Sequence, residues 1–191
     1  MKPILVLYAT REGHTGRIAA RLASTVRARG FSADVVDAAQ IPAGFCLDAY
    51  SAAIIAASVH RGLHEREIID FVKHHRDELE RIQTAFLSVS LSEAGAEDST
   101  ATPRRRAQAA ADVERMIADF LSETGWHPAK IKAVAGALRY SKYNFLLRFV
   151  MKRIAQRAGA TTDTSKDHEY TGWAALDQLV DELVSADARI A

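Results

Sequence analysis

Five short apolar runs alternate with longer amphipathic segments along this chain, and this alternation limits the possible folds more than any single motif does. Short apolar runs bounded by polar residues indicate buried strands, whereas apolar residues spaced three and four positions apart indicate helices. Strands that alternate with helices predict a parallel sheet covered by helices on both faces. The expected strands span residues 4–9, 32–38, 52–58, 85–91 and 131–138.

Five helical segments are expected between and after these strands, at residues 15–29, 64–80, 103–123, 142–158 and 173–185. Gly30 suits the end of the first helix, because glycine readily adopts the left-handed conformation found there. Thr102 and Pro103 suit the N-cap and the first position of the third helix. The polar stretch "SEAGAEDSTATP", residues 92–103, is expected to be a loop. The predicted fold class is a doubly wound α/β sheet.

Composition predicts one globular domain and excludes several classes of function. The 191 residues are 48% hydrophobic, which fits a single domain over 1–191, with a core of about 1–140 and a helical extension of about 141–191. A net charge of +1 creates no overall field for nucleic acid. The single cysteine, Cys46, cannot form an internal disulfide. Because neither a signal peptide nor a run of about 20 apolar residues is evident, we expect a cytoplasmic protein.

The stretch "LYATREGHTGRIA", residues 7–19, leads from the first strand into the first helix. In an open parallel sheet, ligands bind outside the carboxyl ends of the strands, and the N–H groups at a helix N-terminus attract anions. Thr10 and Thr15 add hydroxyl groups, and Gly13 permits close backbone approach. Neither a Walker loop nor a motif of three spaced glycines is present. The turn alone is equally consistent with one bound phosphate and with an ordinary turn capped by Thr15.

Two further segments end strands at the same edge of the sheet: "ASVHRGLH", residues 57–64, and "SVSLSE", residues 88–93. Together with the first turn they resemble the FMN site of the flavodoxin fold. The resemblance extends over nearly the whole chain to the flavodoxin-like, menaquinone-dependent protoporphyrinogen oxidase family of bacteria. It is carried by "YATREGHT", "AASVHRGLHEREIIDFVKHH", "AGALRYSKYNFLLRFVMKRIAQRAG" and "TTDTSKDHEYTGW".

This resemblance implies a flavodoxin-like sheet of order 2-1-3-4-5, an FMN cofactor, and oxidation of protoporphyrinogen IX to protoporphyrin IX, with the electrons passed to a quinone. The acidic segment "SEAGAEDST" stands where the family can carry a basic loop, so an FMN electron carrier without a porphyrin substrate is the alternative. The FMN phosphate is expected on Thr10, Arg11, Glu12, Gly13, His14 and Thr15. The isoalloxazine ring is expected between Ser58, Val59, His60, Arg61 and Gly62 on one side and Ser88, Val89, Ser90, Leu91 and Ser92 on the other.

No catalytic side chain is assigned, because in such a protein the flavin carries the redox chemistry. Arg61 or His60 would stabilise the anionic reduced ring, and Gly62 would let a peptide approach its N5 edge. Alternatively, Arg61 pairs with Glu65 and His60 is a solvated loop residue. No histidines, cysteines and carboxylates are spaced as zinc ligands are, so no metal is expected.

The segment 141–159 combines cations with aromatic side chains on one helical face, which is typical of contact with an anionic lipid surface. The residues concerned are Lys142, Phe145, Arg148, Phe149, Lys152 and Arg153. We expect peripheral contact with the inner face of the cytoplasmic membrane. Alternatively, Phe145 and Phe149 pack against the C-terminal helix or against a second subunit of a homo-oligomer.

A second basic cluster, Arg104 to Arg106, stands in the first turn of the third helix. Cations there oppose the helix dipole and need partners. We expect a solvated ion-pair cluster with the nearby carboxylates of Glu93, Glu97 and Asp98. The alternative is that these arginines bind the propionate groups of a porphyrin.

Overall fold

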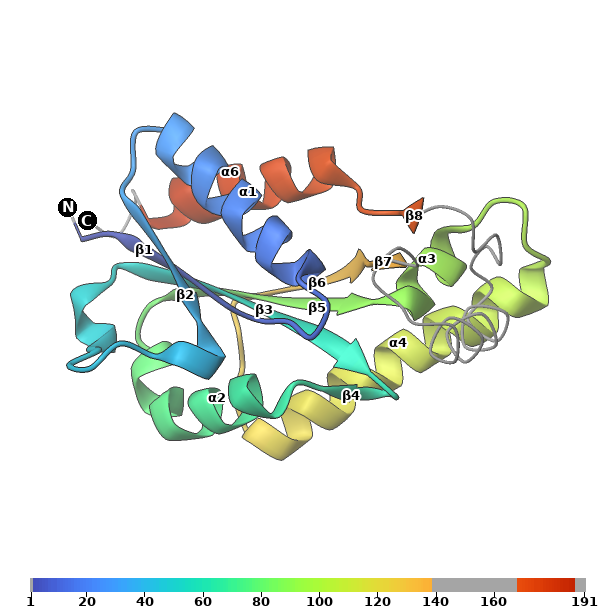
Figure 1. Cartoon of the computed structure of the whole chain (residues 1–191), viewed down its shortest axis with the longest axis horizontal. Coiled ribbons are helices and arrows are strands. Elements are labelled where there is room, and N and C mark those ends of the chain that lie inside the picture. Colours follow the sequence, from blue (N-terminus) through green and yellow to red (C-terminus); the bar gives the residue numbers. More distant parts are fainter. Residues whose placement is uncertain (1, 139–167, 188–191) are drawn as a thin grey trace.

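A parallel sheet lies between two layers of helices in the computed structural model, which describes residues 2–138 and 168–187 (Figure 1). Its five parallel strands are β1 (Ile4–Ala9), β2 (Ala33–Asp37), β3 (Ala52–His60), β5 (Gln83–Ser90) and β6 (Lys130–Ala135). They are hydrogen-bonded in the order β2-β1-β3-β5-β6. This is the expected order 2-1-3-4-5 when β4 (Leu63–His64), a short strand antiparallel to the end of β3, is set aside.

Helices cover both faces of the sheet (Figure 1). One face carries α1 (His14–Ala28) and α6 (Trp173–Asp187), and the other carries α2 (Arg66–Leu79) and α4 (Pro103–Thr124). The remaining short elements are η1 (Ala38–Gln40), η2 (Leu47–Ala49), α3 (Leu91–Glu97), β7 (Ala137–Leu138) and β8 (His168–Glu169). The expected helix at 142–158 lies outside the described residues.

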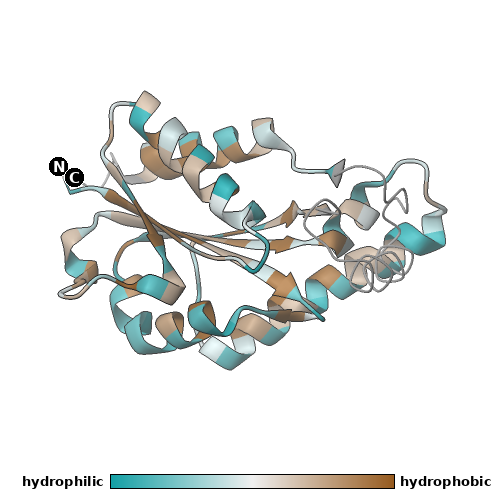
Figure 2. Ribbon diagram, in the orientation of Figure 1, coloured by the Kyte–Doolittle hydropathy of each residue, from teal (hydrophilic) through white to brown (hydrophobic). Residues whose placement is uncertain are grey.

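The core has two halves because successive strand residues point to opposite faces of the sheet. In β1, Ile4 and Val6 pack with α1 and α6, whereas Leu5 and Leu7 pack with α2 and α4. All four side chains are fully buried. This explains why the strand sequences are apolar at nearly every position, and hydrophobic colouring accordingly concentrates on the strands in Figure 2. Among the described helices, none is long and apolar enough to cross a membrane.

Several expected helix ends are confirmed. Thr102 is the N-cap of α4, its Oγ1 accepting a hydrogen bond from the Arg105 backbone N–H at 3.4 Å, and Pro103 is the first helical residue. Gly30 follows the end of α1 with a φ of 87°, the left-handed region that glycine favours. Helix α2 begins two residues later than expected, because His64 is part of strand β4.

The expected loop at 92–103 is wrong for its first part, where α3 forms directly after β5. Ser90 is the N-cap, and its Oγ accepts a hydrogen bond from the Glu93 backbone N–H at 3.1 Å. A serine followed three residues later by a glutamate is the sequence pattern of a capping box. This pattern, rather than the polar composition, determines the local structure.

Strand β6 is shorter than the expected 131–138, because the chain leaves the sheet at Gly136. The Gly136 N–H donates to the Ser90 carbonyl at 2.9 Å, and a Cβ at this position would lie 3.4 Å from the same oxygen. Beyond it, β7 pairs antiparallel with β8. A side chain at position 136 would therefore pack directly against the backbone of Ser90.

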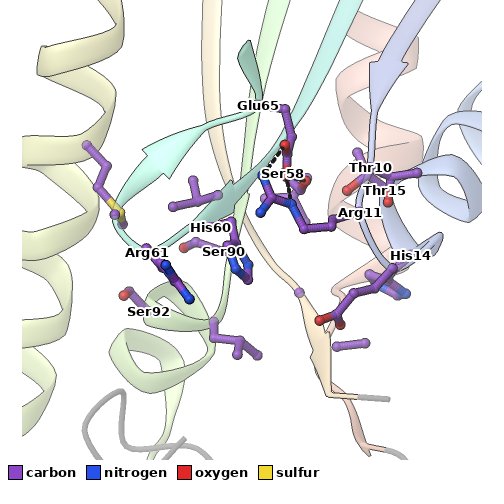
Figure 3. Close-up of a pocket in the computed structure, with 18 of the residues that line it drawn as sticks. Thr10, Arg11, His14, Thr15, Ser58, His60, Arg61, Glu65, Ser90 and Ser92 are labelled. Atoms are coloured by element: carbon purple, nitrogen blue, oxygen red, sulfur yellow. Dashed lines mark hydrogen bonds and ion pairs between the residues drawn. The ribbon is translucent and has the colours of Figure 1, made fainter. Parts of the chain in front are cut away.

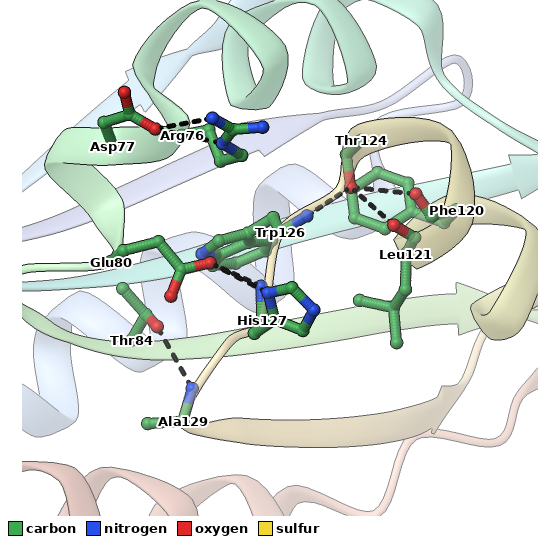
Figure 4. A network of polar contacts seen from close by, with 10 residues as sticks. All are labelled: Arg76, Asp77, Glu80, Thr84, Phe120, Leu121, Thr124, Trp126, His127 and Ala129. Atoms are coloured by element: carbon green, nitrogen blue, oxygen red, sulfur yellow. Dashed lines mark hydrogen bonds and ion pairs between the residues drawn. The ribbon is translucent and has the colours of Figure 1, made fainter.

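At the far end of the sheet, polar contacts hold the connection from α4 to β6 (Figure 4). Gly125 ends α4 in the left-handed conformation, and the Trp126 side chain after it is fully buried. The His127 backbone N–H donates to Glu80 Oε1 at 2.8 Å, and the Ala129 N–H donates to Thr84 Oγ1 at 3.2 Å. These bonds fix the point at which β6 enters the sheet.

Candidate functional site

A cavity of about 650 Å³ opens at the carboxyl ends of β1, β3 and β5 (Figure 3). This is the edge at which open parallel sheets bind ligands, and the volume lies within the range of about 300–1,000 Å³ typical of small-molecule sites. The cavity is lined by these expected residues: Thr10, Arg11, Glu12, His14, Thr15, Ser58, Val59, His60, Arg61, Gly62, Val89, Ser90, Leu91 and Ser92. The three predicted loops therefore do converge.

The β1–α1 turn presents the N-terminus of a helix to the cavity. Gly13 is the N-cap, with a φ of 85°, and its backbone N–H donates to Thr10 Oγ1 at 2.9 Å. The alternative N-cap, Thr15, lies inside the helix and is almost fully buried. Because Gly13 has no side chain to cap the helix and the first turn contains no acidic residue, the N–H groups there favour an anion.

A buried carboxylate ties this turn to the β3–β4 segment. Arg11 Nε and Nη2 donate to the two oxygens of Glu65 at 3.2 and 2.9 Å, and Ser58 Oγ donates to Glu65 Oε1 at 3.2 Å. The Glu65 side chain is only 7% exposed. The hydrogen bond to Glu65 is the main reason that the pKa of Arg11 is raised. The cation that pairs with Glu65 is therefore Arg11, and the alternative pairing with Arg61 is wrong.

Strands β3 and β4 form a hairpin whose two-residue turn is Arg61 and Gly62. Both residues have positive φ, 53° and 82°, as a type I′ turn requires. Arg61 is exposed and makes no hydrogen bond or ion pair with any of the described residues. Burial, followed by the nearby Arg11 guanidinium, lowers the pKa of His60. His60 therefore favours its neutral form, which makes it a weak source of positive charge.

Two expected residues do not line the cavity. Gly13 has no side chain to face the cavity. Ser88 is fully buried, and its Oγ is hydrogen-bonded to His64 Nε2 at 2.9 Å. The His64 ring contacts the rings of Phe86 and Phe120, with centroid separations of 5.4 and 5.0 Å. Burial lowers the pKa of His64 to about 4, so this histidine is neutral at neutral pH. The hydrogen bond between His64 and Ser88 ties strand β4 of the hairpin to strand β5.

The C-terminal segment packs against the β1–α1 turn. Thr171 Oγ1 donates to the Ala135 carbonyl at 2.8 Å and lies 2.7 Å from His14 Nε2. Because the single hydroxyl proton points to Ala135, His14 Nε2 is the donor in the second bond. Nearby, Glu169 accepts hydrogen bonds from Trp173 Nε1 at 2.9 Å and Arg17 Nη1 at 2.8 Å. The distinctive "YTGW" tail is therefore part of the support of the cavity.

Sequence reasoning missed six lining residues of the cavity, which come from α4, from the chain just after β6 and from the start of α2. The residues missed are Glu65, Asp112, Arg115, Met116, Gly136 and Ala137. Asp112 and Arg115 form an ion pair at 3.1 Å. Positions 112, 115 and 116 follow helical spacing, so they share one face of α4. Nothing local in the sequence places this face at the sheet edge, because the crossing of α4 over the sheet is a tertiary feature.

Arg104 to Arg106 do not form the close ion pairs of the expected cluster, although the hydrogen bonds from Thr100 and, to a lesser extent, Arg106 lower the pKa of Asp98. Their alternative role in binding propionate groups stays a prediction. Within the described part of the chain, no ion pair joins these arginines to Glu93, Glu97 or Asp98. The Asp98 carboxylate instead accepts the Thr100 backbone N–H at 2.8 Å and its hydroxyl at 2.7 Å. The arginines do not line the cavity either, since its α4 wall is Asp112, Arg115 and Met116, roughly 15 Å further along the helix.

Comparisons with known proteins agree with this fold and site. Residues 5–165 match the family described as a flavodoxin domain. The chain is also 32% identical over 179 residues to protoporphyrinogen IX dehydrogenase (quinone) of Escherichia coli, covering 94% of this chain and 93% of that protein. The chain belongs to the flavodoxin-domain family of protoporphyrinogen IX dehydrogenases.

Another member of this dehydrogenase family, from Leishmania major, is 30% identical over 185 residues, which cover 95% of this chain and 74% of that protein. Among solved structures, a short-chain flavodoxin associated with a non-canonical PDU bacterial microcompartment superposes with a TM-score of 0.55. The superposition covers 98% of this chain and 99% of that chain at 14% identity, so it supports the flavodoxin fold alone. The flavodoxin-domain assignment thus agrees with the sheet order described above.

Proposed function

We propose that this protein is an FMN-dependent dehydrogenase of haem biosynthesis, which oxidises protoporphyrinogen IX to protoporphyrin IX and passes the electrons to a quinone. The observation that supports this most directly is the cavity at the carboxyl ends of β1, β3 and β5, in a chain with full-length relatives named for that reaction. Such a cavity lets a cofactor and a substrate meet without a side-chain nucleophile.

The β1–α1 turn suits the phosphate group of FMN. The N–H groups at the start of α1 attract an anion, and Gly13 has no Cβ to obstruct it. Thr10 and Thr15 line this part of the cavity and can donate hydroxyl hydrogen bonds. These residues would hold the phosphate, with Arg11, Glu12 and His14 around it.

The opposite part of the cavity suits an aromatic ring system. Val59, Leu91, Met116 and Ala137 supply apolar walls that exclude water. We propose that the ring lies between the segments 58–62 and 89–92. When bound, FMN supplies the redox chemistry, namely acceptance of electrons from the substrate and their release to the quinone. The residues of the chain orient the reactants and provide the apolar surroundings.

The proposal is tested on the purified full-length protein. Acid-released flavin should be identified as FMN, and oxidation of protoporphyrinogen IX, followed by porphyrin fluorescence under anaerobic conditions, should depend on an added menaquinone analogue. A yellow protein that does not oxidise the porphyrinogen would instead support the electron-carrier alternative. A protein that takes up no FMN would contradict both functions.

We further propose that menaquinone is the acceptor and that the protein acts in the cytoplasm, at the inner face of the membrane. The segment argued for membrane contact, residues 141–159 with its cations and phenylalanines, lies outside the described residues, so this part rests on the sequence pattern. Co-sedimentation with anionic vesicles at low salt tests this membrane contact, and no co-sedimentation would contradict it.

We also propose a single domain over 1–191, for which one cooperative unfolding transition is expected. Light scattering would detect a homo-oligomer.

A further inference from the structure

The charged side chains that line the cavity are mostly neutralised by one another. The cations are Arg11, Arg61 and Arg115, and the carboxylates are Glu12, Glu65 and Asp112. Arg11 is bound by both oxygens of Glu65, and Arg115 is paired with Asp112. Arg61 differs, because its exposed guanidinium makes no hydrogen bond or ion pair within residues 2–138 and 168–187. Among the three arginines that line the cavity, Arg61 can therefore bind an external anion without breaking an existing ion pair.

The backbone at Arg61 is in a conformation that arginine disfavours. Its φ of 53° lies in the left-handed region, and a type I′ turn of this kind prefers asparagine followed by glycine. Backbone strain at a residue that lines a cavity is an observation from which a role of its side chain can be inferred. The hairpin is held at its base, since the Glu65 N–H donates to the Ser58 carbonyl at 3.1 Å and His64 is bonded to Ser88.

Arg61 lies apart from the phosphate end of the cavity. In Figure 3 its side chain is beside Ser92, across the cavity from Thr10 and Thr15. An anion held by the start of α1 would therefore not be the one that Arg61 binds. Between these two ends the walls are apolar, with Val59 and Leu91 among the lining residues. With the FMN ring between these walls, a ligand that reaches Arg61 combines a large flat body, which can stack on the flavin, with a peripheral anionic group.

We propose that Arg61 binds a propionate carboxylate of the porphyrinogen and thereby orients the macrocycle in the cavity, an inference that rests on the proposed function. A planar guanidinium forms two parallel hydrogen bonds with a carboxylate, which fixes direction as well as position. Arg61 is a substrate-binding residue in this scheme, and the macrocycle would lie against the flavin ring that the apolar walls hold. Arg115 contributes less, because Asp112 already occupies its guanidinium.

The experiment compares two ligands on the FMN-loaded, full-length protein. Protoporphyrin IX carries free propionates, whereas its dimethyl ester has the same ring with the carboxylates capped. The test variant is Arg61→Asn, because asparagine suits the left-handed turn and should keep the fold stable. Arg115→Gln is the control within the cavity, and Arg104→Gln is the control on exposed α4 surface outside it.

We expect Arg61→Asn to weaken binding of protoporphyrin IX on the order of tenfold, the size expected for one charge-assisted contact, and to leave binding of the ester within about twofold. The comparison is made at saturating FMN, because Arg61 also belongs to the segment 58–62 that is proposed to border the flavin ring. Arg115→Gln should weaken binding of protoporphyrin IX less than Arg61→Asn does, and Arg104→Gln should not weaken it. Equal weakening for both ligands, or no weakening for either, would overturn the inference while leaving the proposed function intact. Failure of the wild-type protein to bind either porphyrin would overturn both.

Discussion

The β1–α1 turn and the β3–β4 hairpin face the same cavity but present positive charge in different ways. The turn uses backbone N–H groups at the start of α1, positioned by Gly13 and Thr10. The hairpin uses one guanidinium, that of Arg61, on a left-handed backbone. A backbone site changes little when side chains change, whereas a side-chain site is easily altered. The difference suggests a division of roles, with the cofactor phosphate at the turn and substrate selection at the hairpin.

Acid should destabilise the protein through the buried His64 of the hairpin, and this is the largest effect that we expect. Burial lowers the pKa of His64 from 6.5 to about 4, so the unfolded chain binds more protons between these pH values. The free energy of unfolding should therefore fall by about 3 kcal/mol as pH decreases from 6.5 to 4. Urea unfolding measured across this range would give the slope.

The matched variant is His64→Gln, which offers Ser88 a polar partner that does not titrate. Its free energy of unfolding should lack this component of the pH dependence. If the free energy of unfolding of His64→Gln depended on pH as steeply as that of the wild-type protein, other titrating groups would be responsible for the pH dependence.

The contact between the two regions can be broken at Arg11. Arg11→Gln leaves the carboxylate of Glu65, 7% exposed, without its cation. We expect a loss of about 2 kcal/mol of folding free energy, below the 3–5 kcal/mol typical of fully buried pairs because Arg11 itself is largely exposed. The double variant Arg11→Gln with Glu65→Gln should recover part of that loss in chemical denaturation. Strictly additive effects of the two substitutions would mean that the pair does not couple the loops.

The turn itself can be tested with two glycines of nearly equal φ. Gly13→Ala and Gly30→Ala should each cost about 1–2 kcal/mol, because both positions are left-handed, with φ of 85° and 87°. Only Gly13→Ala should also weaken FMN binding, on the order of tenfold, in a fluorescence-quenching titration. Equal FMN affinities for the two variants would move the phosphate away from this turn.

The smallest effect is expected at the C-terminal support of the turn. Thr171→Val keeps the shape of the side chain but removes the hydroxyl bonded to His14 and Ala135. We expect thermal unfolding to show a loss of about 1 kcal/mol. Thr100→Val, which removes an exposed hydroxyl bond to Asp98, serves as the control and should cost less. Equal losses would mean that the tail does not support the site.

Much of the fold could be predicted because it depends on local patterns. The continuous apolar run of β1 has the expected bounds, 4–9, and the threonine and proline at 102 and 103 mark the start of α4 as expected. The loop at 92–103 was predicted from polarity, although the serine and glutamate at 90 and 93 already held the capping pattern of α3. Here a specific hydrogen-bonding pattern outweighed composition.

The site was predictable only in part, because its remaining features join distant segments. The three loops converge as expected, since parallel strands end at one edge of a sheet. The pairing of Arg11 with Glu65 spans 54 positions and has no sequence signature. The α4 wall at Asp112, Arg115 and Met116 depends on how that helix crosses the sheet. The nearby arginine triplet at 104–106 was more conspicuous in the sequence but lies outside the cavity.

The bond between His14 and Thr171 joins residues separated by 157 positions. During synthesis, the turn that begins α1 emerges from the ribosome long before its partner exists. The nascent chain can form β1 and α1 early, but the finished support of the turn must wait until residue 171 has been translated. We therefore expect the ribosome-bound intermediate to hold FMN poorly, so that stable cofactor capture follows synthesis of nearly the whole chain.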